Sequence, residues 1–435
     1  MGAEQLQAVP HLTTALTGPL LEIEERLLER ETPIEQWFHE RWLATPAPFY
    51  ASVDLRNAGF KLAPVDTNLF PAGFNNLNPA FHPLCIQALQ IAVERLCPKA
   101  CRILLVPENH SRNTFYWENI GALVELLERA GYQVRVGSLL PEPAGRQSFS
   151  LSGGRTISVE PIERTGDTVT VQGYKPCFVL LNNDLSTGAP ALLQGIAQPV
   201  VPATVMGWWN RLKSNHFTHY RGVAAEFGEF VQIDPWLIDP VFRRCGHIDF
   251  QKREGEDCLA ENVHTVLEEV RLKYREYGIT QEPFVIVKAD SGTYGMGIMT
   301  VRDANDVRQL NRKQRNKMAV IKEGQTVQQV LVQEGVYTFE TLGDAQTVAE
   351  PVVYMVDRFV VGGFYRVHTA RGADENLNAP GMQFRPLAFA DSCSCPDKKR
   401  SPDASPNRFY AYGVLGRLAA LAAARELHAA MAPNP

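Results

Sequence analysis

The chain has 435 residues, of which 45% are hydrophobic and 21% are charged, as is typical of a globular protein with a large buried core. At about 100–200 residues per domain, this length corresponds to about two to four domains. The 43 basic and 48 acidic residues give a net charge of −5, so neither nucleic acid nor an anionic membrane is an expected partner.

The N-terminal residues lack the basic region and apolar core of a signal peptide, and no stretch approaches the roughly 20 apolar residues that cross a bilayer. The eight cysteines are few for this length and predict reduced thiols rather than a disulfide framework. Cys393 and Cys395 form the one tight pair, and their spacing is too short for a structural zinc site. We therefore expect a cytoplasmic protein and leave the role of that pair open.

Residues 18–45 are expected to be helical, because their apolar residues recur at helical spacing. The next stretch, to about residue 80, is rich in Asn, Asp, Gly and Pro, which favour turns over regular elements. Helical and strand-like segments then alternate: helices at 80–96 and 113–131, strands at 101–108, 132–139 and 177–184, and a hairpin at 156–173. Continuous apolar runs separated by helices predict a mainly parallel sheet that is covered on both faces.

The second half of the chain is expected to mix helices and strands differently. An amphipathic helix is predicted at 258–278, and polar, proline-bearing residues 391–408 have the composition of a mobile loop. The predicted strands are 284–289, 297–301, 328–334, 347–355 and 358–368. We therefore predict an α/β protein with an N-terminal parallel-sheet α/β domain followed by an α+β domain. The expected units are a helical segment at 1–49, the α/β domain at 50–205, the α+β domain at 206–390, the loop at 391–408 and a C-terminal helix at 409–435.

The segment VIVKADSGTYGMGIMTV, residues 285–301, has a lysine followed by three glycines between two apolar strands. A Walker A loop has its lysine after the glycines, and a dinucleotide fingerprint leads into a helix, so neither motif matches. Glycines let backbone N–H groups approach phosphate oxygens, and the lysine provides a positive charge. The candidate phosphate contacts are Lys288, Ser291, Gly292, Tyr294, Gly295 and Gly297. A plain hairpin turn is the alternative, and the residues downstream favour the phosphate site.

Acidic, basic and amide residues follow in an order that suits a nucleotide. Gln333 and Glu334 end an apolar strand, where a carboxylate can bind an adenine amine or ribose hydroxyls. Arg366, on a later strand, is suited to brace a transferred phosphoryl group. The oxygen-rich turn beyond it suits Mg²⁺, and a solvated turn is the alternative for this cluster alone. Its candidate ligands are Glu375, Asn376 and Asn378, next to Asp374.

This order of lysine, glycine hairpin, acidic strand end, arginine and Asn-rich turn resembles the ATP-grasp superfamily of carboxylate–amine ligases, especially its glutathione synthetase-like members. The whole chain is similar to a narrower group, the proteobacterial glutamate–cysteine ligase family. The segments that carry this similarity are SVDLRNAGFKLAPVDTNLFPAGFNNL, GWWNRLKSNHF, VKADSGTYGMGIMTV and YRVHTARGADENLNAPGMQFRP. The resemblance implies that residues 206–390 form an ATP-grasp-like catalytic domain.

The resemblance also implies a reaction, the ATP-dependent joining of the glutamate γ-carboxylate to the cysteine amine, which is the first step of glutathione synthesis. ATP would phosphorylate the γ-carboxylate, with Mg²⁺, Lys288 and Arg366 offsetting the phosphate charge, and the amine would attack the acyl phosphate. The family's usual magnesium strand is not matched at Glu375, which makes Glu350 an alternative ligand. Lys213 is the candidate for a second ATP-contacting lysine, with a solvated helix lysine as the alternative.

Glutamate and cysteine, both small molecules, are the partners that the resemblance implies, and a homo-oligomer is left open. The loop-rich stretch after residue 50 is expected to hold them, since long loops without regular structure are often functional. The candidate substrate contacts are Arg56, Asn57, Lys61, Asn68 and Asn75, with Asp54, Asp66 and Asn76 beside them. Arg56 or Lys61 would pair with a carboxylate, whereas the alternative is that the Asn and Asp residues only form turns.

Other functions fit parts of the same pattern. A different ATP-grasp ligase would join other amino acids. A nucleotide-binding regulatory protein would keep the glycine hairpin without turnover, and a sugar- or polyphosphate-binding protein would use that hairpin alone.

Overall fold

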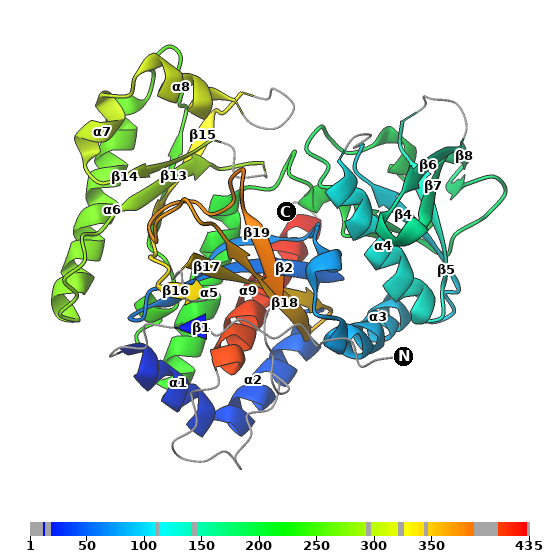
Figure 1. Ribbon diagram of the computed structural model, residues 1–435, viewed down its shortest axis with the longest axis horizontal. Coiled ribbons are helices and arrows are strands. Elements are labelled where there is room, and N and C mark those ends of the chain that lie inside the picture. Colours follow the sequence, from blue (N-terminus) through cyan, green and yellow to red (C-terminus); the bar gives the residue numbers. More distant parts are fainter. Residues whose placement is uncertain are drawn as a thin grey trace.

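The computed structural model describes residues 12–13, 19–109, 113–140, 146–292, 297–320, 326–342, 347–386 and 408–432. Outside these ranges lie Tyr294, Gly295, Cys393, Cys395 and almost all of the loop predicted at 391–408. The described elements gather around three larger sheets, which Figure 1 shows as a central group between two outer groups.

The central sheet has seven strands, all antiparallel, in the order β1-β16-β17-β18-β19, with the β2–β3 hairpin paired to β17. Its strands are β1 (Leu12–Thr13), β2 (Tyr50–Asn57), β3 (Leu62–Asn68), β16 (Glu340–Leu342), β17 (Thr347–Val356), β18 (Phe359–Val367) and β19 (Gln383–Pro386). β17 is long enough to pair with β16 and β2 along one edge and with β18 along the other. The strands expected at 347–355 and 358–368 are confirmed.

The β2–β3 hairpin shows that the prediction of turns after residue 50 was wrong. Val53 and Leu55 of β2 are fully buried in the core. The residues that alternate with them are polar and line a cavity: Ser52, Asp54 and Arg56. This period of two is the pattern of a strand with one apolar face, which the Asn, Asp and Pro content concealed. The hairpin pairs with β17 and not with the strands of the 101–184 region, although the sequence grouped them in one domain.

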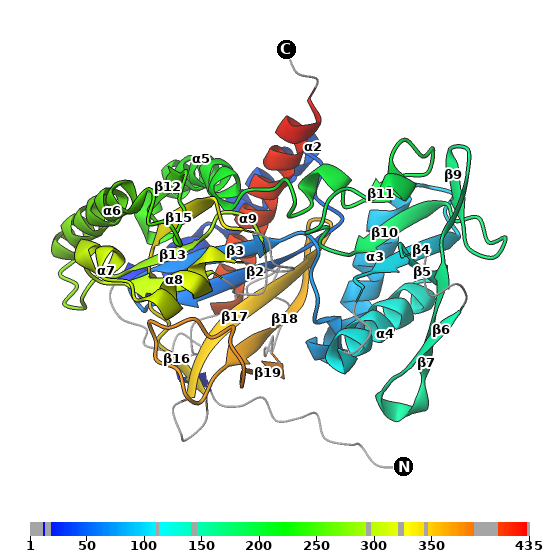
Figure 2. The same ribbon diagram turned by 90° about the horizontal axis from the view of Figure 1, so that it is seen from above.

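Helices pack on one face of the central sheet. They are α1 (Pro19–Glu29), α2 (Glu31–Ala44), α5 (Lys213–Val231) and α9 (Arg408–Met431). α9 crosses the sheet, as Figures 1 and 2 show, and a Cβ added at Gly416 would lie only 3.1 Å from Cγ1 of Val353 on β17. Small residues in this alanine-rich helix therefore allow its close approach to the sheet. None of the helices that the structure describes is long and apolar enough to cross a membrane.

The single helix expected at 18–45 is divided at Arg30, between α1 and α2. In a continuous helix the ring of Pro33 would clash with the carbonyl group of Glu29, and Pro33 has no N–H group to donate. Within the first turn of α2 neither problem arises, so the proline sets the start of the second helix.

A six-stranded sheet forms one outer group, in the order β11-β10-β4-β5-β7-β6, and all its pairings are parallel except that of β6. Its strands are β4 (Arg102–Pro107), β5 (Gln133–Ser138), β6 (Gln147–Ser150), β7 (Thr156–Pro161), β10 (Phe178–Asn182) and β11 (Val200–Val201). The helices α3 (His82–Leu96) and α4 (Thr114–Arg129) cover one face. The mainly parallel sheet is thus confirmed, and the predicted hairpin is narrower, formed by β8 (Glu163–Thr165) and β9 (Thr168–Thr170).

The strand order of this sheet creates a crevice. From β4 the chain continues through α4 to β5 on one side, whereas β10 lies on the other side of β4. The connections that follow β4 and β10 therefore leave the sheet in opposite directions. Ligands of open α/β sheets bind at the carboxyl ends of two neighbouring strands of this kind.

A four-stranded antiparallel sheet, in the order β12-β15-β13-β14, forms the other outer group. Its strands are β12 (Phe242–Gly246), β13 (Val285–Ala289), β14 (Ile298–Val301) and β15 (Gln329–Glu334). The helices of this group are α6 (Glu256–Glu276), α7 (Ala304–Arg308) and α8 (Arg312–Ala319). Short 3-10 helices elsewhere are η1 (Phe74–Asn76), η2 (Pro79–Phe81), η3 (Ser152–Gly154), η4 (Ala191–Leu193), η5 (Thr204–Met206) and η6 (Pro235–Leu237). The strands predicted on either side of the glycine segment are confirmed.

Candidate active site

A cavity of about 360 Å³ lies where the three larger sheets meet, between β2 and β3, the ends of β13 and β15, and the carboxyl ends of β4 and β10. Most of the residues predicted from the sequence line it: Arg56, Asn68, Asn75, Lys213, Lys288, Gly292, Gln333, Glu334, Glu350, Arg366, Asn376 and Asn378. Folding therefore collects these side chains from widely separated segments into one place.

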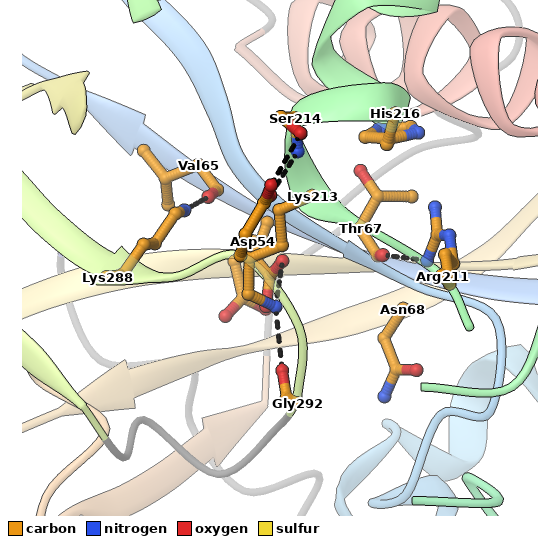
Figure 3. Close-up of polar contacts among 12 residues, drawn as sticks. Asp54, Val65, Thr67, Asn68, Arg211, Lys213, Ser214, His216, Lys288 and Gly292 are labelled. Carbon is orange, nitrogen blue, oxygen red and sulfur yellow. Dashed lines mark hydrogen bonds and ion pairs between the residues drawn. The ribbon is translucent and has the colours of Figure 1, made fainter. Parts of the chain in front are cut away.

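Two buried lysines lie beside one carboxylate in this cavity. Lys288 of β13 donates to the carbonyl oxygen of Val65 at 2.7 Å, as Figure 3 shows. Lys213, the first residue of α5, donates to the carbonyl oxygen of Gly292 at 2.9 Å (Figure 3). Its Nζ also lies 3.4 Å from Oδ1 of Asp66. Both ammonium groups are therefore held by a carbonyl oxygen and are available to offset the charge of an anion.

The electrostatics of this group follow from burial and proximity. Burial lowers the pKa of Lys288 to about 8, although Asp66 opposes the shift. Burial raises the pKa of Asp66, but the charges of Lys213, Lys288 and Arg211 outweigh it and hold this pKa at about 2. Lys213 is only 7% exposed, and its Nζ lies 3.8 Å from the centre of the Trp208 ring, which excludes the alternative of a solvated helix lysine.

The start of α5 is anchored to the end of β13 by Asp290. Its carboxylate, which is fully buried, accepts hydrogen bonds from the backbone N–H and the hydroxyl of Ser214, each at 2.7 Å. Its carbonyl oxygen accepts from the N–H of Lys213 at 2.7 Å. Asp290 thus satisfies N–H groups that a helix start leaves unpaired, and it sets the position of Lys213 relative to Lys288.

An arginine and two carboxylates form the second charged group of the cavity. Arg366 of β18 donates to Asp54 at 2.8 Å and to Glu350 at 2.5 Å. Glu350 also accepts from Nε of Arg56 at 3.0 Å. Burial lowers the pKa of Arg366, but the two carboxylates outweigh it and raise this pKa; burial also raises the pKa of Asp54. Nε of Arg366 has no hydrogen-bond partner among the described residues.

The end of β15 offers two further polar atoms. Gln333 and Glu334 are 2% and 1% exposed. Oε2 of Glu334 accepts from Lys61 at 2.8 Å and from the N–H of Val241 at 2.9 Å. Nε2 of Gln333 and Oε1 of Glu334 have no partner within the part of the chain that is described. A donor and an acceptor are thus left for a ligand.

Five of the predicted residues that the structure describes are not among those that line the cavity: Asn57, Lys61, Ser291, Gly297 and Glu375. Asn57 donates to Glu340 at 2.9 Å in the core, and the ammonium group of Lys61 is held by Glu334. Glu375 is paired with Arg371 at 2.7 Å on the surface. Asn57 and Lys61 are thus taken up by buried hydrogen bonds and Glu375 by a surface ion pair, whereas Ser291 and Gly297 flank residues outside the described ranges.

Sequence reasoning missed the residues at the crevice of the parallel sheet. Glu108 directly follows β4, and Asn182 ends β10; both line the cavity, with Asn113, Asn119 and Asp184. Asn182 donates to the carbonyl oxygen of Pro71 at 2.8 Å, which holds the loop after β3 against the sheet. The signal that could have found them was the run of polar residues directly after two apolar parallel strands.

The donor set of the cavity fits Mg²⁺. No group of three His, Cys, Asp or Glu side chains among the described residues forms a metal site by itself. Mg²⁺ needs only one or two protein carboxylates, with phosphates and water completing its shell. Glu350, Asn376 and Asn378 line the same cavity and offer one carboxylate and two amides. Each oxygen of Glu350 accepts a hydrogen bond from an arginine and keeps a further lone pair.

Comparison with known proteins identifies the family. The family model for glutamate-cysteine ligase matches residues 24–427. A crystal structure from Methylobacillus flagellatus KT, provisionally named a gamma-glutamylcysteine synthetase, is 61% identical, with a TM-score of 0.89 over 97% of this chain and 99% of that chain. D-alanyl-alanine synthetase A from Vibrio cholerae O1 biovar eltor is 12% identical, with a TM-score of 0.31 over 73% and 81%, too weak a likeness to support an argument. No curated protein matches the chain significantly. The chain belongs to the glutamate-cysteine ligase family and is an ATP-dependent ligase of glutathione biosynthesis.

Proposed function

We propose that this enzyme joins the γ-carboxylate of glutamate to the amine of cysteine through an acyl phosphate, with ATP as the phosphoryl donor and Mg²⁺ as the cofactor. The observation that carries the proposal is a single cavity lined by buried lysines, by side chains of Gln333 and Glu334 that each have an atom without a partner among the described residues, and by carboxylate and amide groups. A ligase that activates one substrate and joins it to another needs both kinds of group within reach of each other.

The nucleotide is proposed to lie along β13 and β15. Oε1 of Glu334 would accept from a ribose hydroxyl or the adenine amine, and Nε2 of Gln333 would donate to the nucleoside, because both buried atoms lack a partner among the described residues. Lys213 and Lys288 would meet the phosphates. Buried polar atoms without partners cost free energy, so a ligand that pairs them binds favourably.

The chemistry would proceed in two balanced steps. An oxygen of the γ-carboxylate attacks the terminal phosphorus of ATP, and ADP leaves. The amine nitrogen then attacks the acyl carbon, inorganic phosphate leaves, and the amine loses its proton. Arg366 and Lys288 would offset charge on the transferred group. When bound, Mg²⁺ would neutralise phosphate charge, held by Glu350 with Asn376 and Asn378.

The amino acids are proposed to lie toward the crevice of the parallel sheet. Glu108 and Asp184 line this side of the cavity and carry the negative charge that suits an ammonium group. Asn68, Asn75 and Asn113 line the same side and offer amide groups for α-carboxylates. We place the enzyme in the cytoplasm, and Asn57 and Lys61 are proposed as supports rather than substrate contacts.

Release of ADP and phosphate over a panel of amino acids tests this function. Phosphate release that requires both glutamate and cysteine is the expected result. With glutamate alone, added hydroxylamine should capture the acyl phosphate as a hydroxamate. Phosphate release that is indifferent to cysteine would indicate a ligase with other substrates, and ATP binding without any product would indicate a regulatory protein.

The variant Glu334→Ala tests the position of the nucleotide. We expect the KM for ATP to rise by about tenfold or more, since a charge-assisted hydrogen bond is lost, with the KM values of the amino acids little changed. A KM for ATP equal to that of the unmodified enzyme would overturn the proposed position and favour binding through the glycine segment alone.

A further inference from the structure

The turn between β2 and β3 carries a lysine into the interior of the neighbouring group of elements. The N–H of Ala58 donates to the carbonyl oxygen of Lys61 at 2.9 Å, which closes the turn. The side chain of Lys61 is fully buried. Its ammonium group donates to Oε2 of Glu334 at 2.8 Å and to the carbonyl oxygen of Asp239 at 2.9 Å, and it lies 4.2 Å from the centre of the Trp236 ring.

These contacts hold one oxygen of the Glu334 carboxylate, Oε2, in place and do not involve the other oxygen, Oε1. Oε2 receives both Lys61 and the N–H of Val241, and the N–H of Glu334 donates back to the carbonyl oxygen of Val241 at 2.7 Å. Oε1 has no partner in the described part of the chain, and the residue lines the cavity. The carboxylate is therefore held in one orientation from behind.

We propose that Lys61 is a positioning residue for the nucleotide: it compensates the charge of the Glu334 carboxylate and orients it, so that Oε1 accepts a hydrogen bond from the nucleoside, without itself touching a substrate. This inference rests on the proposed function, because it assumes that ATP lies against Glu334. It gives Lys61 a role different from the substrate contact that the sequence suggested.

The physical reason is the cost of a buried charge. A carboxylate that is 1% exposed is costly to bury unless a cation and hydrogen bonds compensate its charge, and without Lys61 the N–H of Val241 is the partner that remains for Oε2 among the described residues. Other charged groups do not replace the lysine. Asp239, whose carbonyl oxygen accepts from Lys61, is itself acidic, and burial raises its pKa to about 6, with Arg221 and Lys61 opposing.

Residues of three further elements surround the ion pair of Lys61 and Glu334. Asp234 precedes η6, Arg221 lies on α5, and Tyr274 lies on α6. Arg221 is directed to Asp239 at 3.3 Å, and Asp234 is paired with Lys273 at 2.7 Å. Burial raises the pKa of Tyr274, so this phenol is neutral at physiological pH. Among the described residues, Lys61 thus forms the ion pair with Glu334; burial lowers the pKa of Lys61, and Glu334 opposes the shift.

Substitution Lys61→Met tests the proposal, because it removes the charge and keeps most of the aliphatic stem. Binding of Mg²⁺ with a non-hydrolysable ATP analogue is measured by calorimetry in Lys61→Met, Glu334→Gln and the double variant. We expect Lys61→Met to weaken binding by about tenfold, with the KM values of both amino acids little changed. In the Glu334→Gln background, Lys61→Met should add little further loss.

The kinetic constants separate positioning from a general loss of structure, because a positioning role changes the KM for ATP and leaves the KM values of the amino acids little changed. Lys273→Met is the matched control: it removes a lysine next to the same η6 segment and away from the cavity, and it should leave nucleotide binding unchanged.

The measurements distinguish an error in the proposed nucleotide site from an error in the proposed role of Lys61. If Glu334→Gln and Glu334→Ala both bind the analogue as the unmodified enzyme does, the proposed nucleotide site is wrong. If they weaken binding while Lys61→Met does not, or if Lys61→Met raises the KM values of the amino acids as much as it weakens nucleotide binding, the role of Lys61 is wrong. Should Lys61→Met fail to fold, the double variant, which replaces the buried ion pair with a neutral pair, is compared with Glu334→Gln alone, and clearly weaker binding in the double variant would refute the inference.

Discussion

At the scale of single residues, the cavity contains charged side chains whose pKa values burial has shifted from their ordinary values. Lys288 was predicted from its place before the glycines, and the structure adds its environment: a buried ammonium group that donates to Val65 beside Asp66. Its lowered pKa of about 8 makes this lysine sensitive to pH in the range where the enzyme can be assayed.

We predict that ATP binding takes up a proton near pH 8. In the free enzyme Lys288 is partly deprotonated there, since its pKa is about 8, and nearby phosphate charge raises that pKa again. Affinity should therefore fall as pH rises above about 8. Calorimetry in two buffers with different ionisation enthalpies measures the uptake, and the variant Lys288→Arg, which keeps its charge, is the control. The same uptake in Lys288→Met would contradict the assignment.

At the scale of elements, local pattern and tertiary context contribute differently. The strands β13, β14, β15, β17 and β18 and the helices α4, α6 and α9 lie close to their predicted positions, because each is a continuous apolar run, an amphipathic pattern or a helix-forming composition that the local sequence displays. β2 and β3 were missed although β2 alternates polar and apolar residues, because turn-forming residues outweighed the period in the interpretation. Asp290 was not singled out, because its partner Ser214 is distant in sequence.

We predict that Asp290→Ala lowers the free energy of unfolding by about 1–3 kcal/mol, since two hydrogen bonds to the start of α5 are lost. It should also raise the KM for ATP, because Lys213 is the first residue of that helix. Urea denaturation and steady-state kinetics measure the two effects. Ser214→Ala removes one of the two bonds and should have a smaller effect in both, whereas an Asp290→Ala variant as stable as the unmodified enzyme would refute the anchoring role.

At the scale of the whole molecule, the C-terminal helix ties the segments together. Glu426 of α9 accepts from Arg211 at 2.9 Å and lies 3.2 Å from His216, and all three side chains are buried. Arg211 in turn donates to the carbonyl oxygen of Thr67 at the end of β3. This cluster links α9, α5 and the hairpin that lines the cavity.

We predict that Glu426→Ala lowers the free energy of unfolding by about 3–5 kcal/mol at neutral pH, because it leaves Arg211 buried without a counter-charge. Burial raises the pKa of Glu426, but Arg211 and His216 outweigh it and hold the pKa at about 2, against 4.5 for an ordinary glutamate. A lowered pKa contributes stability above pH 4.5 that is lost as pH falls toward 2. Denaturation is therefore measured at several pH values. The difference in free energy of unfolding between Glu426→Ala and the unmodified enzyme should shrink as pH falls below 4.5. A difference that stays constant with pH would contradict the pairing.

The sequence by itself determined much of this protein: the mainly parallel sheet, the strands on either side of the glycine segment, and the lysine, glutamate and arginine that line the cavity. Those features depend on the spacing of residues close together in the chain, which a single sequence displays. Only the tertiary structure decided that Lys61 meets Glu334, that Glu108 and Asn182 lie beside the hairpin, and that Glu375 faces solvent while Glu350 faces the cavity. Such contacts join residues that are far apart in the chain. They form because sheets and helices bury their apolar faces against one another, and this packing also places polar residues of different elements in contact. No local sequence pattern specifies which polar residues meet.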